Sequence, residues 1–275
     1  MDAQHPRHQI MTLSPFFHGL ACSLLALTAQ ALAWQPSGET VPPAPQEFRA
    51  AWISTVHNID WPSRSGLSGA AQRSELLNIL NTCAQLKLNA VFLQVRPNAD
   101  ALYRSFLEPW SQWLSGPGVN PGYDPLAFAI QEAHRRGIEL HAWFNPFRAK
   151  ANVNHAVGRN HISLTRPDLM KRSGSVLLMN PSASASRDHA MKVILDYFYP
   201  YPAPGRSWTP GSFGDGKSPS QRRAYIDDFV HDMYKSVKSS KPWVRVGISP
   251  FGIWRPGVPA GIEAGVDAYE HLACD

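Results

Sequence analysis

Cysteine is scarce in this chain, with 3 residues of this type among 275. Cys22 lies in an apolar N-terminal run, Cys83 falls on the apolar stripe of a predicted helix, and Cys274 is next to the last residue. Proteins stapled by disulfide bonds carry an even set of cysteines at regular spacings, which this sequence does not have. We therefore predict no structural disulfide, and we expect Cys83 to pack as a small apolar side chain.

The sequence also lacks the short motifs that mark common cofactor and metal sites. No Gly-x-Gly-x-x-Gly or Walker-type loop follows a predicted strand, which argues against nucleotide and dinucleotide binding. The 11 histidines include no His-Glu-x-x-His or His-x-x-x-His pair, so no metal site is predicted. A Gly-x-Ser-x-Gly nucleophile turn is absent as well. We expect no cofactor.

Positive charge is not concentrated anywhere in the chain. The formal net charge is +5, but no run of five or more Lys or Arg residues occurs. A nucleic-acid-binding surface requires a basic patch or stripe. We therefore interpret the excess charge as a solvated surface and expect no nucleic-acid partner.

Residues 1–33 have the features of an export signal. Arg7 precedes an apolar run over Gly19–Ala33, and Ala31-Leu32-Ala33 offers small residues at both cleavage positions. The run is shorter than the roughly 20 residues that a membrane-spanning helix requires. The Pro-rich residues 34–46 then form a predicted linker to the folded domain.

These features predict an exported protein located in the periplasm. Cys22 follows Gly19-Leu20-Ala21, which leaves a lipid anchor and attachment to the outer membrane as the less favoured alternative. It is less favoured because the apolar run continues past Cys22 and Gly19 replaces the usual leucine.

The clearest pattern in the sequence is a strand, a helix and a second strand. The apolar segments Ala90–Arg96 and Glu139–Asn145 are predicted strands on either side of an amphipathic helix. Asp124 is suited to cap the start of that helix, Pro125 fits its first position, and Gly137 ends it. This order predicts a βαβ unit with parallel strands.

Other segments repeat this alternation of strand, polar loop and helix. They are a strand at Phe48–Ser54, helices at Ala70–Leu86, Ser186–Leu195 and Gln221–Lys238, and a strand at Val244–Ser249. The repetition predicts an α/β fold of the (β/α) TIM-barrel type, with about four recognisable parallel strands. In such a barrel the loops after the strands build the active site.

Several phrases of the sequence resemble one known family. They are FRAAWISTVHNIDWPS, NAVFLQVRPNADALYRSFLEPWSQWLSG, GYDPLAFAIQEAHRRGIELHAWFNPFRA, DYFYPYP and KPWVRVGISPFGIWR. They are similar to the glycosyl-hydrolase-like family 10 over about residues 47–256. The resemblance implies a TIM-type catalytic barrel in an exported bacterial protein. Because members include an outer-membrane glycosidase of the divisome that cleaves denuded peptidoglycan, it also implies a cell-wall glycan as partner.

Two departures from the family pattern affect the expected activity. In the family, a strand of the form DGIHFDD precedes YFYPYP, whereas here the segment Leu195-Asp196 joins Tyr197 directly. The family's later strands also have no counterpart before Asp275. We therefore expect residues 47–275 to form a partial barrel domain, an internally deleted and truncated copy.

Glycoside hydrolysis normally requires two carboxyl groups on either side of the scissile bond. Asp196 is the first candidate, because it aligns with the second Asp of the family's pair. Glu108, which precedes Pro109-Trp110, is the second candidate for a catalytic role. The alternative for each is structural: Asp196 as a helix-terminal residue and Glu108 as part of a loop.

Ten further residues lie at or beyond predicted strand ends, where polar groups bind sugar hydroxyls and aromatic rings stack on sugar rings. The alternative for each is a structural role in the rim or the core. These candidate substrate-binding residues are Arg96, Asn98, Asp100, His141, Trp143, Asn145, Arg148, Tyr197, Tyr199 and Trp254.

The leading hypothesis is a periplasmic glycoside hydrolase-like protein that cleaves a cell-wall glycan, the strands of peptidoglycan, by carboxylate acid-base chemistry. We expect this turnover to be impaired, so whether the chain is an enzyme stays open at this point. One alternative is a non-catalytic remnant that still binds the glycan. Another is a chain that does not fold alone.

Overall fold

The structure is a computed structural model that describes residues 47–198 and 218–249. Backbone contacts separate Met1–Glu47 from Phe48–Asp275, and the description below concerns the second unit. The predicted signal peptide and linker lie outside the described residues. Within the described part, no helix combines the length and apolar character that crossing a bilayer requires.

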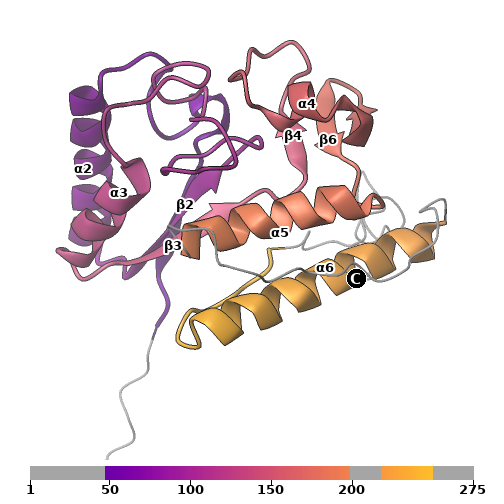
Figure 1. Ribbon diagram of the computed structural model, residues 1–275. Helices are drawn as coiled ribbons and strands as arrows, with labels where there is room; N and C mark the ends of the chain where they lie inside the picture. The colour runs from indigo at the N-terminus through magenta and orange to yellow at the C-terminus, as the bar shows by residue number, and fades with distance from the viewer. Residues whose placement is uncertain (1–46, 199–217, 250–275) are drawn as a thin grey trace, which may run out of the picture. The chain divides into compact units, whose positions relative to one another are not determined.

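Three strands form a parallel sheet in the order β1-β2-β3 (Figure 1). They are β1 (Ala50–Ile53), β2 (Ala90–Arg96) and β3 (Glu139–Phe144), and the connections contain α2 (Gly69–Gln85) and α3 (Pro125–His134). The predicted βαβ unit is confirmed, and β2 has the predicted bounds. The fold is therefore α/β with parallel strands.

The ends of α3 follow from its sequence. The Asp124 side chain accepts a hydrogen bond from the backbone N–H of Ala127 at 2.9 Å, and Pro125 occupies the first turn. Gly137 adopts φ 68°, a left-handed conformation that glycine reaches without steric cost. The helix thus begins where the sequence predicts and ends at His134, shortly before the predicted stop at Gly137.

One face of the parallel sheet packs against α2 and α3. Its buried strand residues are Ile53, Val91, Leu93 and Val95, and the helices contribute Leu76, Leu80, Cys83, Leu126, Ala129 and Ala133. Cys83 lies in this core with 5% of its surface exposed, as expected. Burial of these apolar side chains is the main term that stabilises the unit.

The other face of the sheet carries aromatic rings, here called the aromatic face: Phe48, Trp52, Phe92, His141 and Trp143. Trp52 stacks on Phe92 with ring centroids 4.4 Å apart and meets Trp143 edge-on at 5.1 Å. Phe92 lies 4.7 Å from the His141 ring. Phe48 remains 57% exposed and Trp52 49% exposed. This face is therefore only partly covered.

A second, antiparallel sheet was not predicted. It contains β4 (Arg148–Lys150), β6 (Val176–Met179) and β5 (Met170–Ser173) in the order β4-β6-β5. The short helices α4 (Ile162–Thr165) and η2 (Pro167–Leu169) lie between β4 and β5 in the chain. The segment that follows β3 is thus structured rather than a simple loop.

Helices α5 (Ser184–Phe198) and α6 (Pro219–Ser240) lie side by side (Figure 1). They bury a second apolar cluster with Met191, Ile194, Phe229, Met233 and Val237. Both predicted helices are confirmed, and both are longer than predicted at each end. Asp196 and Tyr197 are consequently helical.

The fourth predicted parallel strand, Val244–Ser249, is wrong, because these residues form no strand. Val244 and Val246 pack instead against the second apolar cluster. A strand requires a neighbour that supplies backbone hydrogen-bond partners. Arg245, in this segment, lies 3.6 Å from Glu139 of β3, and both side chains are well exposed. The described residues thus contain three parallel strands, not four.

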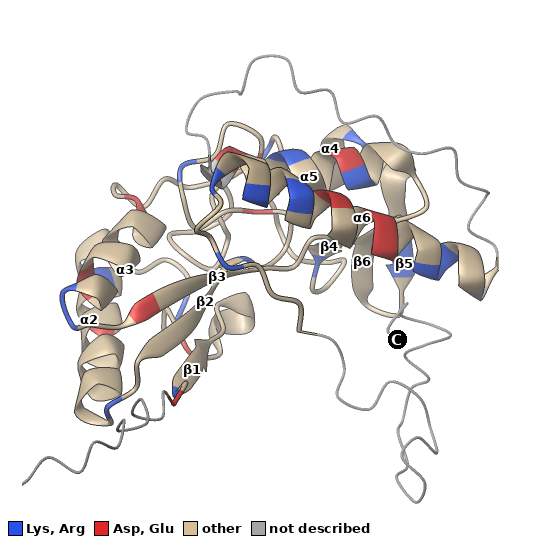
Figure 2. Ribbon diagram, turned by 90° about the horizontal axis from the view of Figure 1, so that it is seen from below, with Lys and Arg blue, Asp and Glu red and all other residues tan. Residues whose placement is uncertain are grey.

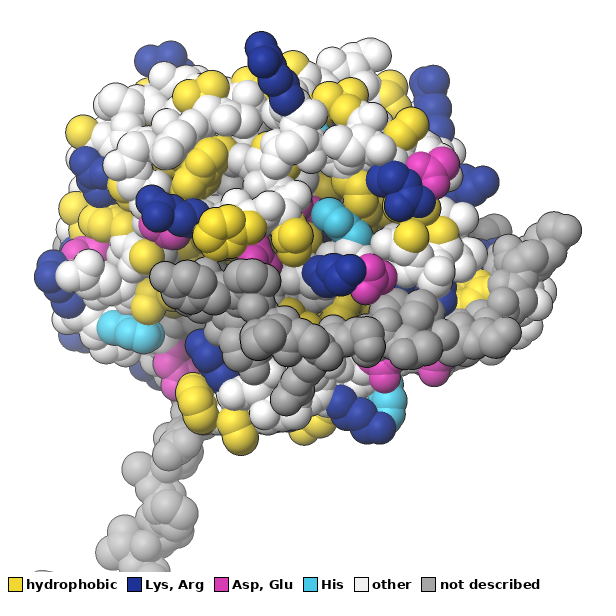
Figure 3. All heavy atoms as spheres, viewed as in Figure 1, with side chains coloured by type: hydrophobic (Ala, Val, Ile, Leu, Met, Phe, Trp, Pro, Cys, Tyr) yellow, Lys and Arg dark blue, Asp and Glu magenta, His cyan; other side chains and the backbone are white. Residues whose placement is uncertain are grey.

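Charged residues occur on β2 and β3 only at the strand ends (Figure 2), with Glu139 at the start of β3 and Arg96 at the end of β2. Lys and Arg side chains are scattered among acidic and hydrophobic ones on the face seen in Figure 3. Arg96 therefore brings a charge to the edge where the parallel strands end.

Candidate active site

Gln94 links the carboxyl ends of the three parallel strands. Its Oε1 accepts hydrogen bonds from the backbone N–H groups of Thr55 at 3.0 Å and Val56 at 2.9 Å. Val56 begins the short helix η1 (Val56–Asn58), which follows β1. The Gln94 Nε2 donates to Asn145 Oδ1 at 2.7 Å, just beyond β3. One buried amide thus fixes the loops after β1 and β3.

Arg96 and Glu108 form a buried, bidentate ion pair. Arg96 Nε donates to Oε2 of Glu108 at 2.8 Å, and Nη2 donates to Oε1 at 2.5 Å. Arg96 Nη1 donates to the carbonyls of Asn145 at 2.5 Å and Pro146 at 3.1 Å. His189, from α5, donates from Nε2 to Glu108 Oε1 at 2.9 Å. The pair joins the loop after β2 to the end of β3 and to α5.

The surroundings of Glu108 favour its ionised form. Burial would raise the pKa of this carboxyl, but the Arg96 charge and the hydrogen bonds from His189 and Arg96 outweigh burial and hold the pKa at about 2. A general acid in glycoside hydrolysis needs a raised pKa. Both Glu108 oxygens are also occupied, so the geometry is that of a structural ion pair.

Asp100 is a second buried carboxylate on the same loop. Its Oδ1 accepts from the backbone N–H of Asn98 at 3.0 Å. Its Oδ2 accepts from Ser111 Oγ at 2.9 Å and from the backbone N–H of Gln112 at 3.2 Å. Burial raises the pKa of Asp100 to about 6, although the hydrogen bonds from Ser111 and Gln112 oppose this rise. With 3% of its surface exposed, Asp100 holds the loop in shape.

Asn98 contributes its main chain to the site. His161 Nε2 donates to the Asn98 carbonyl at 2.8 Å, and His161 Nδ1 lies 2.8 Å from Ser163 Oγ. The amide Nδ2 and Oδ1 of Asn98 are buried and have no partner among the described residues. Asn98 is fully buried, so a sugar could reach it only after its covering segments move.

The remaining predicted residues of β3 and its loop divide between two places. Arg148 Nε donates to the Pro97 carbonyl at 2.8 Å, and its Nη2 donates to Asn145 Oδ1 at 3.2 Å. Asn145 and Arg148 therefore belong to the carboxyl-edge network. His141 and Trp143 lie instead on the aromatic face of the sheet.

Asp196 lies near the end of α5, against the loop that carries Glu108. Ser105 Oγ donates to Asp196 Oδ2 at 2.7 Å, and the backbone N–H of Phe106 donates to the same oxygen at 3.3 Å. Ser105 Oγ in turn accepts from the backbone N–H of Glu108 at 3.2 Å. The structure thus brings both candidate carboxylates to one loop, with Asp196 on a helix rather than at a strand end.

Three of the predicted binding residues cannot be placed in this network. Tyr197 belongs to α5, but its side chain lies outside the described part of the chain, as do Tyr199 and Trp254. Their predicted contacts with sugar rings stay predictions.

Sequence reasoning did not select Gln94, His161 and His189. The sequence did indicate a role for Gln94, because a polar residue inside an apolar strand needs hydrogen-bond partners when it is buried. It did not indicate one for His161 and His189, since their partners Asn98 and Glu108 lie 63 and 81 positions away in the chain. Such contacts follow from the packing of α4 and α5, not from local sequence.

A parallel sheet with connecting helices and a polar network at the carboxyl ends of its strands places the chain in the α/β class, whose ligands bind at that edge. The family model of glycosyl hydrolase-like 10 matches residues 47–206. The chain belongs to this glycosyl hydrolase-like family, which confirms the resemblance noted in its sequence.

Two curated relatives support the assignment. Glycosyl hydrolase YngK of Bacillus subtilis (strain 168) is 37% identical over 258 residues, which covers 84% of this chain and 51% of the relative. Glycosyl hydrolase DigH of Escherichia coli (strain K12) is 28% identical over 277 residues, which covers 86% of this chain and 63% of the relative. The chain thus spans between half and two thirds of these relatives.

Among solved structures, the galactosidase domain of the alpha-galactosidase-sucrose kinase AgaSK is 16% identical. The similarity covers 72% of this chain and 26% of that one, with a TM-score of 0.42. A TM-score of this size does not establish a shared fold.

Proposed function

We propose that this protein is a glycoside hydrolase-like protein that binds a bacterial cell-wall glycan and hydrolyses it weakly, by carboxylate acid-base chemistry. Family membership and the glycosyl hydrolase relatives support the glycan as its target. The parallel sheet supports a location of the binding surface at the carboxyl ends of the strands. The peptidoglycan strand is the substrate class that we propose.

We propose weak turnover because the carboxylates of the loop after β2 are buried or hydrogen-bonded to other side chains. A retaining enzyme holds its two carboxyl groups about 5 Å apart astride the bond, and an inverting enzyme holds them further apart. Glu108 is closed off by Arg96 and His189, and Asp100 is buried. Neither can approach a glycosidic oxygen without leaving its partners.

Asp196 is partly exposed, unlike Glu108 and Asp100, and we propose it as the catalytic carboxylate. It is placed by α5 and by hydrogen bonds from Ser105 and Phe106. Asp196 has no second open carboxylate beside it within the described residues. A displacement of about 1 Å from the working geometry can cost about a hundredfold in rate. The arrangement therefore supports slow hydrolysis at best.

The second candidate function is glycan binding without catalysis. The contact of His189 with Glu108 favours it, because α5 then covers the carboxylate on the loop after β2. In this case the loops would retain a sugar-binding surface, and Asp196 would serve only to attach α5 to the loop.

The test is incubation of the purified chain with soluble, peptide-free peptidoglycan strands, with the products followed by mass spectrometry. We expect traces of cleavage that Asp196→Asn abolishes. The matched control is Asp188→Asn, which changes a partly exposed carboxylate of α5 that pairs with Lys192. Robust cleavage lost only in Asp196→Asn would contradict the proposed weakness. Equal cleavage in all three proteins would contradict the role of Asp196.

We also propose that the three parallel strands belong to a (β/α) barrel of the TIM type. Their order, their connecting helices and the family support this. The aromatic face supports it too, because the face of a barrel sheet opposite its helices is turned inward and buried.

Export to the periplasm, with attachment to the outer membrane as an alternative, is likewise a proposal. It rests on the charged start, the apolar run and the small residues that precede residue 34. N-terminal sequencing of the protein from an envelope fraction is the test. A chain that keeps Met1 and stays in the cytoplasmic fraction would refute it.

A further inference from the structure

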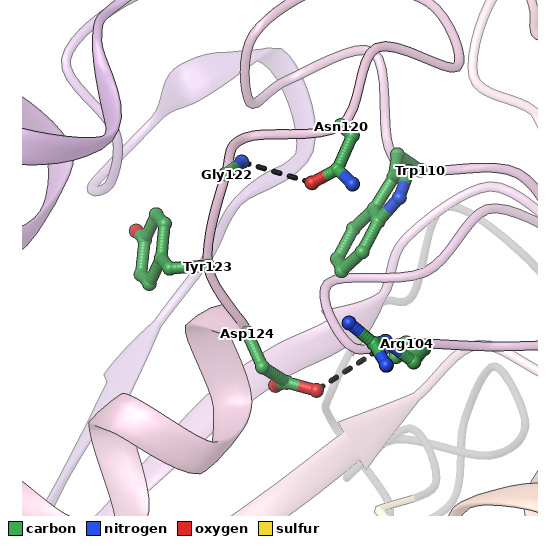
Figure 4. A pocket seen from close by; sticks show the side chains of 6 residues that line it. All are labelled: Arg104, Trp110, Asn120, Gly122, Tyr123 and Asp124. Atoms are coloured by element: carbon green, nitrogen blue, oxygen red, sulfur yellow. Dashed lines mark hydrogen bonds between the residues drawn. The ribbon is translucent and has the colours of Figure 1, made fainter.

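A small hollow lies beside the start of α3 and has no assigned role (Figure 4). Its volume is about 170 Å³, and it is lined by Arg104, Trp110, Asn120, Gly122, Tyr123 and Asp124. Trp110, Asn120 and Arg104 surround the hollow, while the Tyr123 ring points to the other side of the backbone. The lining thus combines one aromatic ring with several polar groups.

Tyr123 holds the backbone on one side of the hollow in place. Its hydroxyl donates to Gln72 Oε1 at 3.1 Å, and the Arg73 guanidinium lies 4.7 Å from its ring centroid. Phe128 meets the ring edge-on at 6.0 Å. Trp110 packs against the main apolar core. Both sides are therefore formed before a ligand arrives, which lowers the entropic cost of binding.

The polar groups of the hollow keep free hydrogen-bonding capacity. Asn120 Oδ1 accepts from the backbone N–H of Gly122 at 2.8 Å, which orients the amide and leaves its Nδ2 available. Asp124 Oδ2 accepts from the backbone N–H of Arg104 at 3.0 Å and has a further lone pair. The Arg104 side chain has no hydrogen bond or ion pair in the described part of the chain.

We propose that this hollow is a subsite that binds one pyranose ring of the glycan. A sugar ring presents an apolar C–H face, which stacks on an indole ring, and a rim of hydroxyls, which need donors and acceptors. Trp110 offers the ring, Arg104 and Asn120 offer donors, and Asp124 offers an acceptor. The volume is below the roughly 300–1,000 Å³ of sites for larger ligands, which suits one ring.

The charge of the hollow favours a sugar over a phosphate. The start of a helix attracts anions through its free N–H groups. Here the carboxylate of Asp124 already caps α3, accepting from Ala127 N–H. An incoming phosphate would meet this negative charge, whereas sugar hydroxyls can donate to it.

The subsite lies on the loop that carries Glu108 and that forms hydrogen bonds with Asp196 of α5. Arg104 precedes Ser105, whose hydroxyl donates to Asp196. Trp110 follows Glu108 by two positions. A ring bound in the hollow would therefore anchor the glycan next to the carboxylate proposed for catalysis. This inference rests on the proposed function and names one of its binding positions.

The test is a titration of the whole chain with a soluble, peptide-free tetrasaccharide of peptidoglycan, followed by tryptophan fluorescence and calorimetry. Arg104→Gln and Trp110→Ala should each raise the Kd by about tenfold or more. The matched controls are Arg159→Gln and Trp243→Ala, which change exposed residues outside the hollow and should leave the Kd unchanged. Thermal unfolding of each variant checks that the fold is retained, and Arg104→Gln removes no hydrogen bond or ion pair of the described residues.

Hydrolysis of the same tetrasaccharide, measured in parallel, separates this inference from the proposed function. Binding that depends on Arg104 and Trp110 without any cleavage supports the subsite and counts against hydrolysis. Cleavage with a KM unchanged in both variants supports hydrolysis and overturns the subsite. Absence of binding by the unmodified chain also overturns it.

Discussion

The Arg96–Glu108 ion pair holds together the loops at the carboxyl ends of the parallel strands. Both side chains are buried, and Arg96 also holds the carbonyls of Asn145 and Pro146. A buried pair is not a large net source of stability, because desolvation offsets the attraction between its charges. Removing one partner is costly all the same, since it leaves the other charge buried and uncompensated.

We therefore expect Glu108→Gln to lower the free energy of unfolding by about 3–5 kcal/mol. The control is Glu139→Gln, whose side chain is 57% exposed and which should change stability by less than about 0.5 kcal/mol. Urea denaturation of the two variants and the unmodified chain provides the measurement. Similar stability in all three would mean that Arg96 finds another counter-charge.

The same carboxyl predicts a dependence of stability on pH. Because the pKa of Glu108 is lowered to about 2 in the folded chain, its ionised form stabilises the fold above its ordinary pKa of 4.5. That contribution is lost as the pH falls from about 4.5 through about 2. It is on the order of 3 kcal/mol, since one pKa unit corresponds to about 1.4 kcal/mol.

Unfolding curves between pH 2 and pH 6 test this for the unmodified chain and Glu108→Gln. The difference in stability between the two should be largest above pH 4.5 and should shrink toward pH 2. A difference that stays constant over this range would show that Glu108 titrates alike in the folded and unfolded states.

At the scale of elements, local sequence was sufficient where the pattern and its partner were both close. The bounds of β2 were predicted because seven apolar-rich residues lie between clear breaks, and its neighbour β3 follows one helix later. The start of α3 was predicted because Asp124 caps it directly. In both cases the hydrogen-bond partners lie close in the sequence, so the local pattern was sufficient.

Elements that depend on distant partners could not be predicted in this way. The antiparallel sheet has strands of three or four residues, too short to show an alternating pattern. Val244–Ser249 does alternate, but its valines are partly buried against the second apolar cluster, and no strand pairs with it among the described residues. Polar residues were correctly expected at the carboxyl edge. The contacts of Arg96 with Glu108 and of Glu108 with His189 were not predicted, because they depend on the position of a loop and of α5.

We predict that molecules of this protein self-associate through the aromatic face. Trp52 and Phe48 are about half exposed, and contiguous apolar patches of this kind favour contact between molecules. We expect Trp52→Lys to weaken self-association about tenfold or more, as measured by sedimentation at several concentrations. The control is Leu164→Lys, which changes a 56% exposed residue of α4 outside the sheet. An equal effect of both variants would mean that added charge alone opposes association.

At the scale of the whole molecule, the chain matches only part of the length of its relatives. The chain spans 51% of YngK and 63% of DigH. Asp196 lies within α5, and its side chain contacts the loop after β2. It therefore does not follow a strand. Sites built on the helices and strands of a scaffold are more precise than sites built on loops, and the hydrogen bonds that hold Asp196 come from the loop after β2.

We predict that turnover rises when a strand is supplied before Asp196 and the chain is extended with the later part of YngK. The inserted strand, about six residues long, should pair with β3 and aim Asp196 at the carboxyl edge, with a second carboxylate beside it. A misplacement of about 1 Å can cost about a hundredfold in rate, so correct positioning should raise turnover strongly. The measurement is the initial rate on peptide-free peptidoglycan for four proteins: the unmodified chain, the insertion alone, the extension alone, and both together.

Only the protein with both changes should be fast, because a catalytic pair needs the strand to hold it and the rest of the barrel to hold the strand. Asp196→Asn in that protein should return the rate to the level of the unmodified chain. If the extension alone restores the rate, Asp196 is already well placed by α5 and the strand is not required. If neither change matters while the tetrasaccharide still binds, glycan binding rather than hydrolysis is the property that this chain retains.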